Sequence, residues 1–368
     1  MSHKSSKPIL IDLFCGAGGL SQGLSYAGFD ARVGIDFDQN AIATYSANHR
    51  NSKAILADIS TISGAELQSL TGTRDIDLVA GGPSCQGYST HGKRVEDDSR
   101  NFLFKEFVRL VEDIQPKFFL MENVKGLLTY SKGHFKTLIE EDFARIGYRV
   151  VSKTLCAADY GVPQMRHRVM FVGTRLPNVD LSFPKPTHGE QTSHDSSSDL
   201  LPYVTVNDAI GDLPLMNGDF NKQIWEYATE TKSKFQKYVR ASGGNGVTLH
   251  NSKALSEQAG LLASFIGQGQ GLRAVPVKYL PDRFKKMRRI RNGQLRRDCT
   301  TLYHRLDPKR PAYTITCYYR NVASGPFLHP WEDRSLSHRE AARLMSFPDH
   351  YEFRGTGIPR QIGNAVPP

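Results

Sequence analysis

Runs of apolar residues separated by glycine and polar turns recur through the first half of the chain. Their length and near-continuous apolar character are typical of buried parallel strands. We expect such strands at residues 8–14, 31–35, 54–57, 76–80 and 118–121. Apolar residues at helical spacing predict helices after the glycine-rich turn at 15–20 through Tyr26, at 102–113 and at 134–146. Two further strands are expected near 148–156 and 168–174. This alternation predicts an α/β fold built on a Rossmann-like parallel sheet.

The character of the chain changes near residue 177. Three prolines lie close together at 177, 184 and 186, and a serine-rich stretch at 191–199 follows, as expected for a linker or surface loop. Patterning then stays irregular until an amphipathic helix at 337–345, where Ser337 and Glu340 form a capping box. We therefore expect a catalytic domain at 1–176, a smaller mixed domain at 177–325 and a return segment at 326–368 that completes the first domain.

Composition excludes several classes of protein. No apolar run among the 368 residues approaches membrane-spanning length, and no signal-peptide core follows the N-terminus. The five cysteines, at 15, 85, 156, 299 and 317, form no C-x-x-C pair. An odd number of scattered cysteines argues against a disulfide framework or a zinc site and suits a reducing cytoplasm. We therefore expect no metal centre and no membrane partner.

Positive charge is concentrated in one segment. The formal net charge is +10, which favours a polyanionic partner. Residues 283–297, here called the basic run, hold eight Lys or Arg among fifteen positions and no acid. Such a run is often only a solvated face. Because apolar residues interleave with this one, we interpret it as a nucleic-acid contact through Arg288, Arg289 and Arg291.

Cys85 occupies a position that suits catalysis. It follows the strand at 76–80 after a Gly-Gly-Pro turn, and the carboxyl ends of such strands are where open α/β sheets bind ligands. Most free cysteines are nevertheless small buried apolar residues. The polar loop at 89–101 is longer than an ordinary connection, and we interpret it as a lid. Because Glu122 ends the next strand, we expect Cys85 and Glu122 to face each other.

A glycine-rich turn at 15–20 joins the first strand to the first helix. Such a turn lets a ligand approach the backbone closely, although alone it is weak evidence. Asp36 and Asp58 end the next two strands. Either acid could be only a helix cap. Two such strand ends beside a glycine turn favour a nucleoside pocket, with Asp36 on the ribose hydroxyls. The turn alone would also allow a dinucleotide oxidoreductase.

Three polar side chains alternate at Gln164, Arg166 and Arg168. In an extended backbone, alternate residues point to the same side, so these three would form one polar row. The alternative is a pair of ordinary surface arginines.

Six motifs, in order and over nearly the whole chain, resemble those of the DNA cytosine-C5 methyltransferases. They are Asp12-Leu13-Phe14-Cys15-Gly16-Ala17-Gly18-Gly19, Pro83-Ser84-Cys85-Gln86, Glu122-Asn123-Val124, Gln164-x-Arg166-x-Arg168, Arg339-Glu340-Ala341-Ala342-Arg343-Leu344-Met345 and Gln361-Ile362-Gly363-Asn364-Ala365-Val366-Pro367. Residues 176–300 match least, as expected for that family's variable target-recognition domain. Two departures are Ser84, where the family often has proline, and the end at Pro368, after which we expect further residues.

The resemblance implies S-adenosylmethionine as cofactor and S-adenosylhomocysteine as product. Cys85 would add to C6 of a flipped-out cytosine. Glu122, its pKa raised by burial, would act at N3, and Arg168, supported by Arg166, would stabilise charge at O2. The implied cofactor contacts are Phe14, Gly16, Gly18, Gly19, Leu20, Asp36, Phe37, Asp58, Ile59, Pro83, Leu103, Asn364 and Val366. The implied DNA contacts are Gln86, Ser89, Arg100, Gln164, Arg288, Arg289 and Arg291.

The expected partner is duplex DNA of a specific sequence, with a cognate restriction endonuclease as a further candidate partner. We expect a monomeric, cytoplasmic, nucleoid-associated bacterial enzyme. Two alternatives stay open: a tRNA cytosine-C5 methyltransferase and a catalytically silent DNA-binding subunit. The catalytic residues do not separate DNA from tRNA, and the second domain with its basic run favours duplex DNA. The presence of Cys85, Glu122 and Arg168 argues against the silent subunit.

Overall fold

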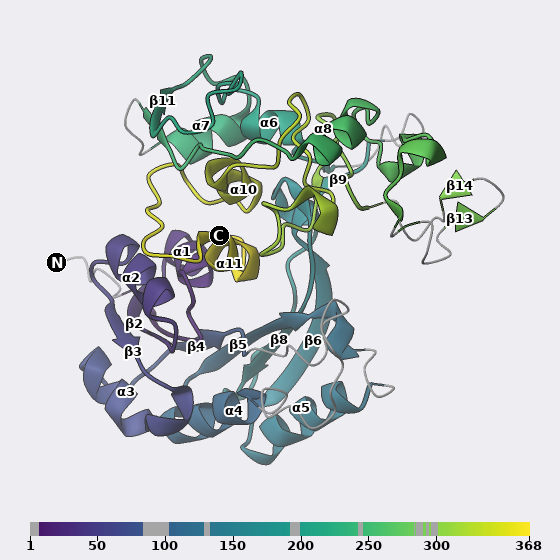
Figure 1. Cartoon of the computed structure of the whole chain (residues 1–368). Coiled ribbons are helices and arrows are strands. Elements are labelled where there is room, and N and C mark those ends of the chain that lie inside the picture. Colours follow the sequence, from purple (N-terminus) through teal and green to yellow (C-terminus); the bar gives the residue numbers. More distant parts are fainter. Residues whose placement is uncertain are drawn as a thin grey trace.

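The computed structural model describes residues 7–83, 103–128, 133–191, 199–241, 246–282, 284, 290–291, 294–295 and 301–368. A large sheet with helices on both faces forms one part of the chain, and a second part of shorter elements lies over it (Figure 1). The large sheet consists of β1 (Ile9–Leu13), β2 (Asp30–Asp36), β3 (Lys53–Leu56), β4 (Leu78–Gly81), β5 (Phe118–Val124), β6 (Arg149–Cys156) and β8 (His167–Thr174). Its neighbouring helices are α1 (Gly19–Tyr26), α2 (Gln39–Asn48), α3 (Gly64–Thr71), α4 (Leu103–Ile114) and α5 (His134–Arg145).

The remaining elements are short. The helices are α6 (Val206–Ile210), α7 (Lys234–Arg240), α8 (Glu257–Ser264), α10 (His338–Leu344) and α11 (Ile358–Asn364). The strands are β7 (Gln164–Met165), β9 (His188–Gly189), β10 (Leu201–Pro202), β11 (Ile224–Glu226), β12 (Gly246–Thr248), β13 (Ile290–Arg291), β14 (Gln294–Leu295) and β15 (Ala312–Tyr313). Of these, β7 pairs in parallel with β15, which joins the two halves of the chain.

The order of strands in the large sheet is β3-β2-β1-β4-β5-β8-β6. The first five run parallel, and β8 is antiparallel to both β5 and β6. Strand order reverses between β1 and β4, and in open α/β sheets the carboxyl ends at such a point form the ligand crevice. The expected α/β fold is confirmed, and all five expected parallel strands are present.

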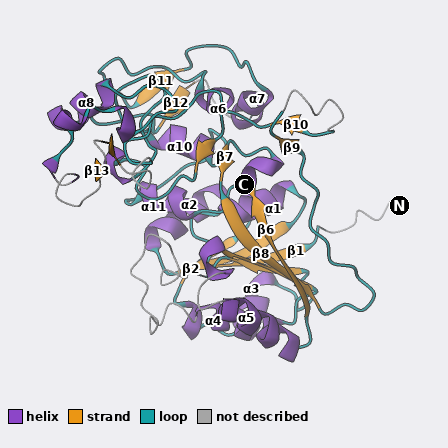
Figure 2. Ribbon diagram, turned by 90° about the vertical axis from the view of Figure 1, so that its right-hand side faces the viewer, coloured by secondary structure: helices purple, strands orange, loops and turns teal. Residues whose placement is uncertain are grey.

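The two faces of the sheet carry different helices (Figure 2). Helices α3, α4 and α5 lie on one face, and α1, α2 and α11 lie on the other. In α4 the buried residues Phe104, Phe107, Val108, Val111 and Ile114 recur at helical spacing, which produces one apolar stripe. Burying each such side chain contributes about 1.5–3 kcal/mol. This core gives the carboxyl edge of the sheet a rigid base.

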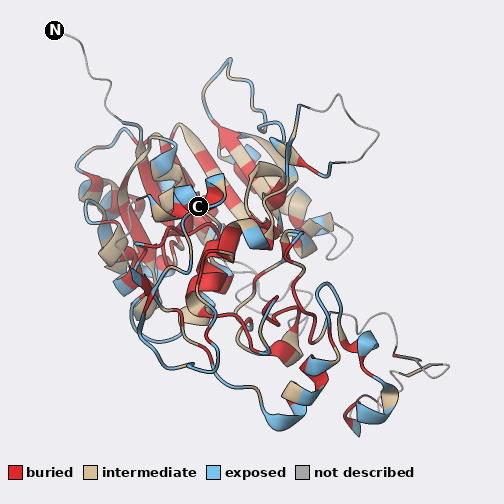
Figure 3. Cartoon of the chain, turned by 90° about the horizontal axis from the view of Figure 1, so that it is seen from above, coloured by how far each residue is buried: buried red, intermediate tan, exposed pale blue. Residues whose placement is uncertain are grey.

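The second half of the chain has two hydrophobic clusters of its own. One combines residues of α6 and α7 with β15, α10 and α11, and also includes Ala17 of the glycine turn. The other lies around α8 and extends to Leu328. Buried residues line the interior of both parts, and exposed residues lie on the peripheral loops (Figure 3). The domain boundaries at 176 and 325 stay a prediction.

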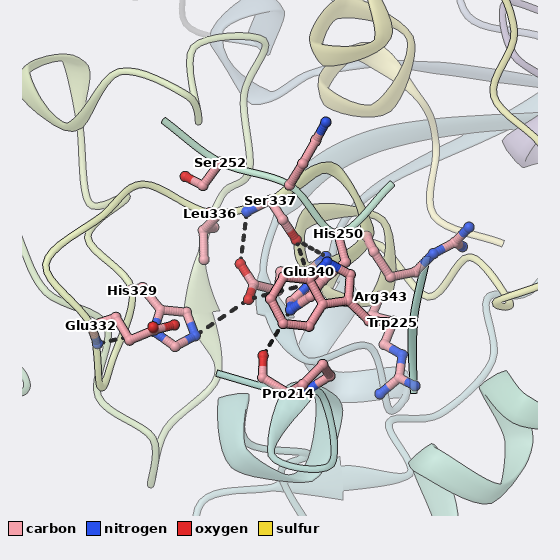
Figure 4. Close-up of polar contacts among 12 residues, drawn as sticks. Pro214, Trp225, His250, Ser252, His329, Glu332, Leu336, Ser337, Glu340 and Arg343 are labelled. Carbon is pink, nitrogen blue, oxygen red and sulfur yellow. Dashed lines mark hydrogen bonds and ion pairs between the residues drawn. The ribbon is translucent and has the colours of Figure 1, made fainter. Parts of the chain in front are cut away.

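A buried ion network anchors the return segment (Figure 4). Arg334 donates to both Glu340 oxygens, over 2.9 and 2.7 Å, and the Ser337 amide donates to Glu340 over 2.7 Å. The latter bond belongs to the expected capping box, which is present. His250 Nδ1 lies 3.0 Å from the Ser337 hydroxyl, and His329 Nε2 lies 3.4 Å from Glu340. These contacts join the segment at His250, and the stretch from His329 to Arg334 just before the helix, to α10.

Both network histidines are held neutral. Two backbone amides, those of Trp331 and Glu332, donate to His329 Nδ1, so this nitrogen carries no proton. His250 Nε2 lies 2.8 Å from the Pro214 carbonyl and donates to it. Burial lowers the pKa of each imidazole. The network therefore depends on unprotonated histidines.

Within the described residues, no helix is long and apolar enough to cross a membrane. The same part of the chain contains no cluster of three His, Cys, Asp or Glu side chains that could hold a metal ion.

Candidate active site

The glycine turn between β1 and α1 forms an open cradle at the carboxyl edge of the sheet. Phe14, Gly16 and Gly18 adopt positive φ angles of 58°, 53° and 88°. The Gly16 amide donates to the Asp36 carboxylate over 2.9 Å, which joins the turn to the end of β2. A Cβ atom on Gly16 would meet no heavy atom within 4 Å. This side of the turn therefore has room for a ligand.

Other segments close the opposite side of the turn. His49 Nε2 lies 3.2 Å from the Gly18 carbonyl oxygen, and the Tyr351 hydroxyl donates to the Ala17 carbonyl over 2.5 Å. A Cβ atom on Gly19 would lie 2.2 Å from the Val366 carbonyl oxygen. Neither His49 nor Tyr351 was predicted from the sequence, because no motif relates two residues 302 positions apart.

The ends of β2 and β3 differ in character. Asp36 accepts hydrogen bonds from the turn and from the Asp38 amide, and burial raises its pKa. Its neighbour Phe37 is 73% exposed, so an aromatic face is available beside the cradle. Asp58 is exposed and caps a short helical turn, and hydrogen bonds from Ser60 lower its pKa. Both expected strand-end acids thus lie at one edge of the sheet, and the second also has the capping role that was the alternative.

The remaining expected cofactor residues line the same edge or support it. Ile59 is buried, and Leu20 packs against a small cluster on the sheet. Leu103 begins α4 and, like Phe14, packs against the main core. Pro83 follows β4, and Asn364 and Val366 lie at the end of α11.

A polar chain lies beneath the turn. The Ser21 hydroxyl donates to Asp12 Oδ2 over 2.6 Å, and the Tyr45 hydroxyl lies 3.1 Å from Ser21. Asp12 Oδ1 is buried and has no hydrogen-bond partner among the described residues. Burial raises the pKa of Asp12 to about 7. These bonds hold α1 and α2 against the end of β1.

Glu122 and Arg168 form the second half of the site. Arg168 Nε lies 2.8 Å from Glu122 Oε1, and only 18% and 12% of the two side chains are exposed. A Cβ atom on Gly82 would lie 3.1 Å from Glu122 Oε2. The Asn123 side chain donates to the Pro83 carbonyl over 3.2 Å. The segment that leads to Cys85 is thus held directly beside the Glu122 carboxylate.

The other two members of the polar row turn inward. Gln164 is fully buried, donates to the Leu344 carbonyl over 2.9 Å and accepts from the Ile315 amide over 2.9 Å. This placement corrects the expectation that Gln164 contacts DNA, because its amide is enclosed and already hydrogen-bonded. Arg166 is also buried and donates to the Ile315, Gly363 and Ala365 carbonyls. Only Arg168 of the row reaches the open site.

Several expected residues lie outside the described part of the chain. Cys85 and the expected DNA contacts Gln86, Ser89, Arg100, Arg288 and Arg289 are among them. The backbone of Arg291 belongs to β13, which pairs with β14 in an antiparallel hairpin. The roles of all these residues stay predictions.

The geometry combines two features at one edge. An open cradle with an exposed aromatic ring and a strand-end acid suits a nucleoside-bearing ligand. Next to it, a carboxylate paired with a guanidinium suits hydrogen bonding to a planar polar group that gains charge during reaction. The arrangement can therefore hold two reactants side by side.

Comparison with protein families identifies one match. The family described as C-5 cytosine-specific DNA methylase matches residues 9–368. Among curated proteins, Type II methyltransferase M1.HphI of Haemophilus parahaemolyticus is 36% identical over 97% of this chain and 83% of its own length. Type II methyltransferase M.DdeI of Desulfomicrobium norvegicum is 33% identical over 98% of this chain and 85% of its own length.

A solved structure has the same architecture. It is a candidate DNA modification methyltransferase encoded within a prophage of E. coli, and the match has a TM-score of 0.73 at 27% sequence identity. The match covers 98% of this chain and 94% of that one.

Proposed function

Since the chain belongs to the C-5 cytosine-specific DNA methylases, whose cofactor is S-adenosylmethionine, we propose that it methylates C5 of a flipped-out cytosine in a specific duplex DNA sequence. The observation that carries the proposal is the Glu122–Arg168 pair beside the entry to the Cys85 loop. This pair shares the carboxyl edge of the sheet with the glycine turn.

Catalysis begins with addition of the Cys85 thiolate to C6 of the cytosine. The new bond between Sγ and C6 pushes electron density toward C5, which otherwise is a poor nucleophile. Glu122 hydrogen-bonds N3 and the exocyclic amine, and Arg168 stabilises developing charge at O2. Bound S-adenosylmethionine supplies an electrophilic methyl group. Loss of the C5 proton to a base and departure of Cys85 then restore the aromatic ring.

The paired guanidinium has a second effect on Glu122. Arg168 holds the carboxylate in one orientation through a charge-assisted bond of 2.8 Å. An acid with a restricted side chain loses less entropy when it binds the base. We therefore assign Arg168 two roles, contact with the base and orientation of Glu122.

Cofactor binding is assigned to the cradle and its far wall. Asp36 would accept hydrogen bonds from the ribose hydroxyls, Phe37 would offer its ring to the adenine, and Asn364 with Val366 would close the far side. The open face at Gly16 and the 73% exposure of Phe37 support this assignment. Gln164 receives a structural role, because its side chain is buried.

The Type II relatives support a proposal about the biological role. We propose that the chain protects a short duplex site from a cognate restriction endonuclease, and that the basic run contacts the DNA backbone. We further propose that it works as a monomer.

The test is transfer of a labelled methyl group from S-adenosylmethionine to unmethylated plasmid DNA and, in parallel, to tRNA. We expect label in the plasmid alone, with the modified cytosines confined to one short sequence when they are mapped. Label confined to tRNA would change the substrate and retain the chemistry. Cofactor binding without label in either nucleic acid would contradict the proposed activity.

A further inference from the structure

Arg166 lies where three distant segments meet. It separates β7 from β8, and its side chain is only 2% exposed. One end of its guanidinium donates to the Ile315 carbonyl over 3.1 Å. The other end donates to the Gly363 and Ala365 carbonyls over 3.2 and 2.8 Å. A single side chain thus bridges the segment after β15 and the end of α11.

The carbonyls on α11 flank a proposed cofactor residue. Gly363 and Ala365 stand on either side of Asn364, and the next carbonyl, that of Val366, packs against Gly19 of the cradle. Arg166 therefore holds the backbone from which Asn364 projects. A Cβ atom on Gly363 would lie 2.2 Å from the Cys317 amide nitrogen, so α11 also packs closely on the segment after β15.

Arg166 is also close in the chain to the base side of the site. Arg168 follows two positions later in β8 and pairs with Glu122. The Arg166 carbonyl accepts from the Ala157 amide over 2.9 Å, which fixes the backbone before β8. Gln164, two positions earlier, accepts a hydrogen bond from the Ile315 backbone amide through its side-chain oxygen.

Arg166 has no contact that would make it a base-binding group. The described residues offer it no carboxylate within ion-pair distance, although Glu122 acts on it electrostatically. Burial lowers the pKa of Arg166 to about 9, so it remains protonated at pH 7. Its Nε is buried and has no partner among the described residues.

We propose that Arg166 is a positioning residue that couples the two halves of the site, holding the cofactor-side backbone at 363–365 in register with the base-side strand β8. The inference rests on the proposed placement of Asn364 at the cofactor. The planar guanidinium places two nitrogens against two different segments, one on Ile315 and one on Gly363 and Ala365. A lysine at this position keeps the charge but gathers its donors on one nitrogen, so it does not reproduce both sets of hydrogen bonds.

The test is binding of S-adenosylhomocysteine without DNA, measured by calorimetry on proteins shown to be folded at that temperature. We expect Arg166→Lys to raise the dissociation constant about tenfold, as for loss of hydrogen bonds to a charged group. The matched control is Arg305→Lys. Arg305 is also buried and donates to backbone carbonyls, those of residues 263, 266, 329 and 332, all within the second half of the chain. We expect Arg305→Lys to lower thermal stability and to leave the dissociation constant for S-adenosylhomocysteine within about twofold of the wild-type value.

A double-mutant cycle separates coupling from general loosening. In the wild-type background, Asn364→Ala should weaken binding. In the Arg166→Lys background its effect should be smaller, because Asn364 is already displaced. Additive effects, or an unchanged dissociation constant in Arg166→Lys, would overturn the coupling. No effect of Asn364→Ala in the wild type would instead overturn the cofactor placement.

Hydrogen exchange on the unaltered protein gives a second test if Arg166→Lys does not fold. S-adenosylhomocysteine should slow amide exchange in residues 157–166, which the proposal joins to the cofactor side through Arg166. Unchanged exchange in that segment would contradict the coupling.

Discussion

Gly19→Ala is expected to damage cofactor binding through a defined steric conflict. The added methyl group would stand 2.2 Å from the Val366 carbonyl oxygen, well inside the 3.0 Å that Cβ atoms keep from other heavy atoms. The conflict is with backbone, so it cannot be relieved by a rotamer change. The end of α11 has to move by about 1 Å, and overpacking of this kind typically costs about 1–3 kcal/mol.

That movement takes Asn364 and Val366 away from the cradle. We expect the dissociation constant for S-adenosylhomocysteine to rise about tenfold to a hundredfold. This is the change that results if the overpacking energy of about 1–3 kcal/mol is lost from the binding free energy. Single-turnover methyl transfer should fall about 100-fold, because a displacement of about 1 Å can cost that much in rate.

Gly260→Ala is the matched control. Gly260 lies within α8, and a Cβ atom there would meet nothing within 4 Å. We expect wild-type cofactor affinity and a gain of roughly 0.5–1 kcal/mol in stability, since alanine is the better helix former. Wild-type affinity in Gly19→Ala would refute the steric argument.

Three further predictions concern the base side of the site, two buried histidines and the basic run. Glu122→Gln should slow single-turnover methyl transfer about 100-fold or more while the affinity for the cofactor stays unchanged. Equal slowing in Asp58→Asn would mean that loss of any acid at this edge of the sheet slows transfer, and would contradict a specific role of Glu122. Burial lowers the pKa of His49 and His338 from 6.5 to about 4, so the unfolded chain binds more protons between these values. The contribution of these histidines to the free energy of unfolding should thus be complete above pH 6.5 and fall by up to about 3 kcal/mol per histidine toward pH 4. Equal free energies of unfolding in urea at pH 7 and pH 5 would contradict this. Neutralising three arginines of the basic run should weaken duplex binding and lower the slope of log binding constant against log salt concentration by about three. An unchanged slope would mean that the basic run is only a solvated surface. These arginines are Arg288, Arg289 and Arg291.

The sequence predicted the parts of the site that depend on local patterning. Apolar runs identified the parallel strands, and the residues after them lie at one edge because parallel strands end on the same side. Glu122 and the glycine turn were found in this way. The antiparallel direction of β8 was not foreseen, because a short apolar run carries no information about strand direction.

The burial of Gln164 and Arg166 depends on packing between segments that are distant in the sequence, and it could not be predicted from local patterning. Alternation placed Gln164, Arg166 and Arg168 on one side, but it did not reveal that residues 312–315 and 363–365 cover the first two. Side chains that alternate along a strand share a face whether that face meets solvent or another segment. Solvent exposure was therefore the missing information.

The proposed mechanism requires Cys85 to form a covalent bond with a cytosine in DNA. The direct measurement uses duplex DNA carrying 5-fluorocytosine at the mapped site, incubated with S-adenosylmethionine and analysed by denaturing gel electrophoresis. Fluorine cannot leave as the C5 proton does, so the enzyme should stay attached to the DNA and migrate as a complex. Cys85→Ser should bind the same duplex and form no such complex. A complex formed equally by Cys85→Ser would contradict the account.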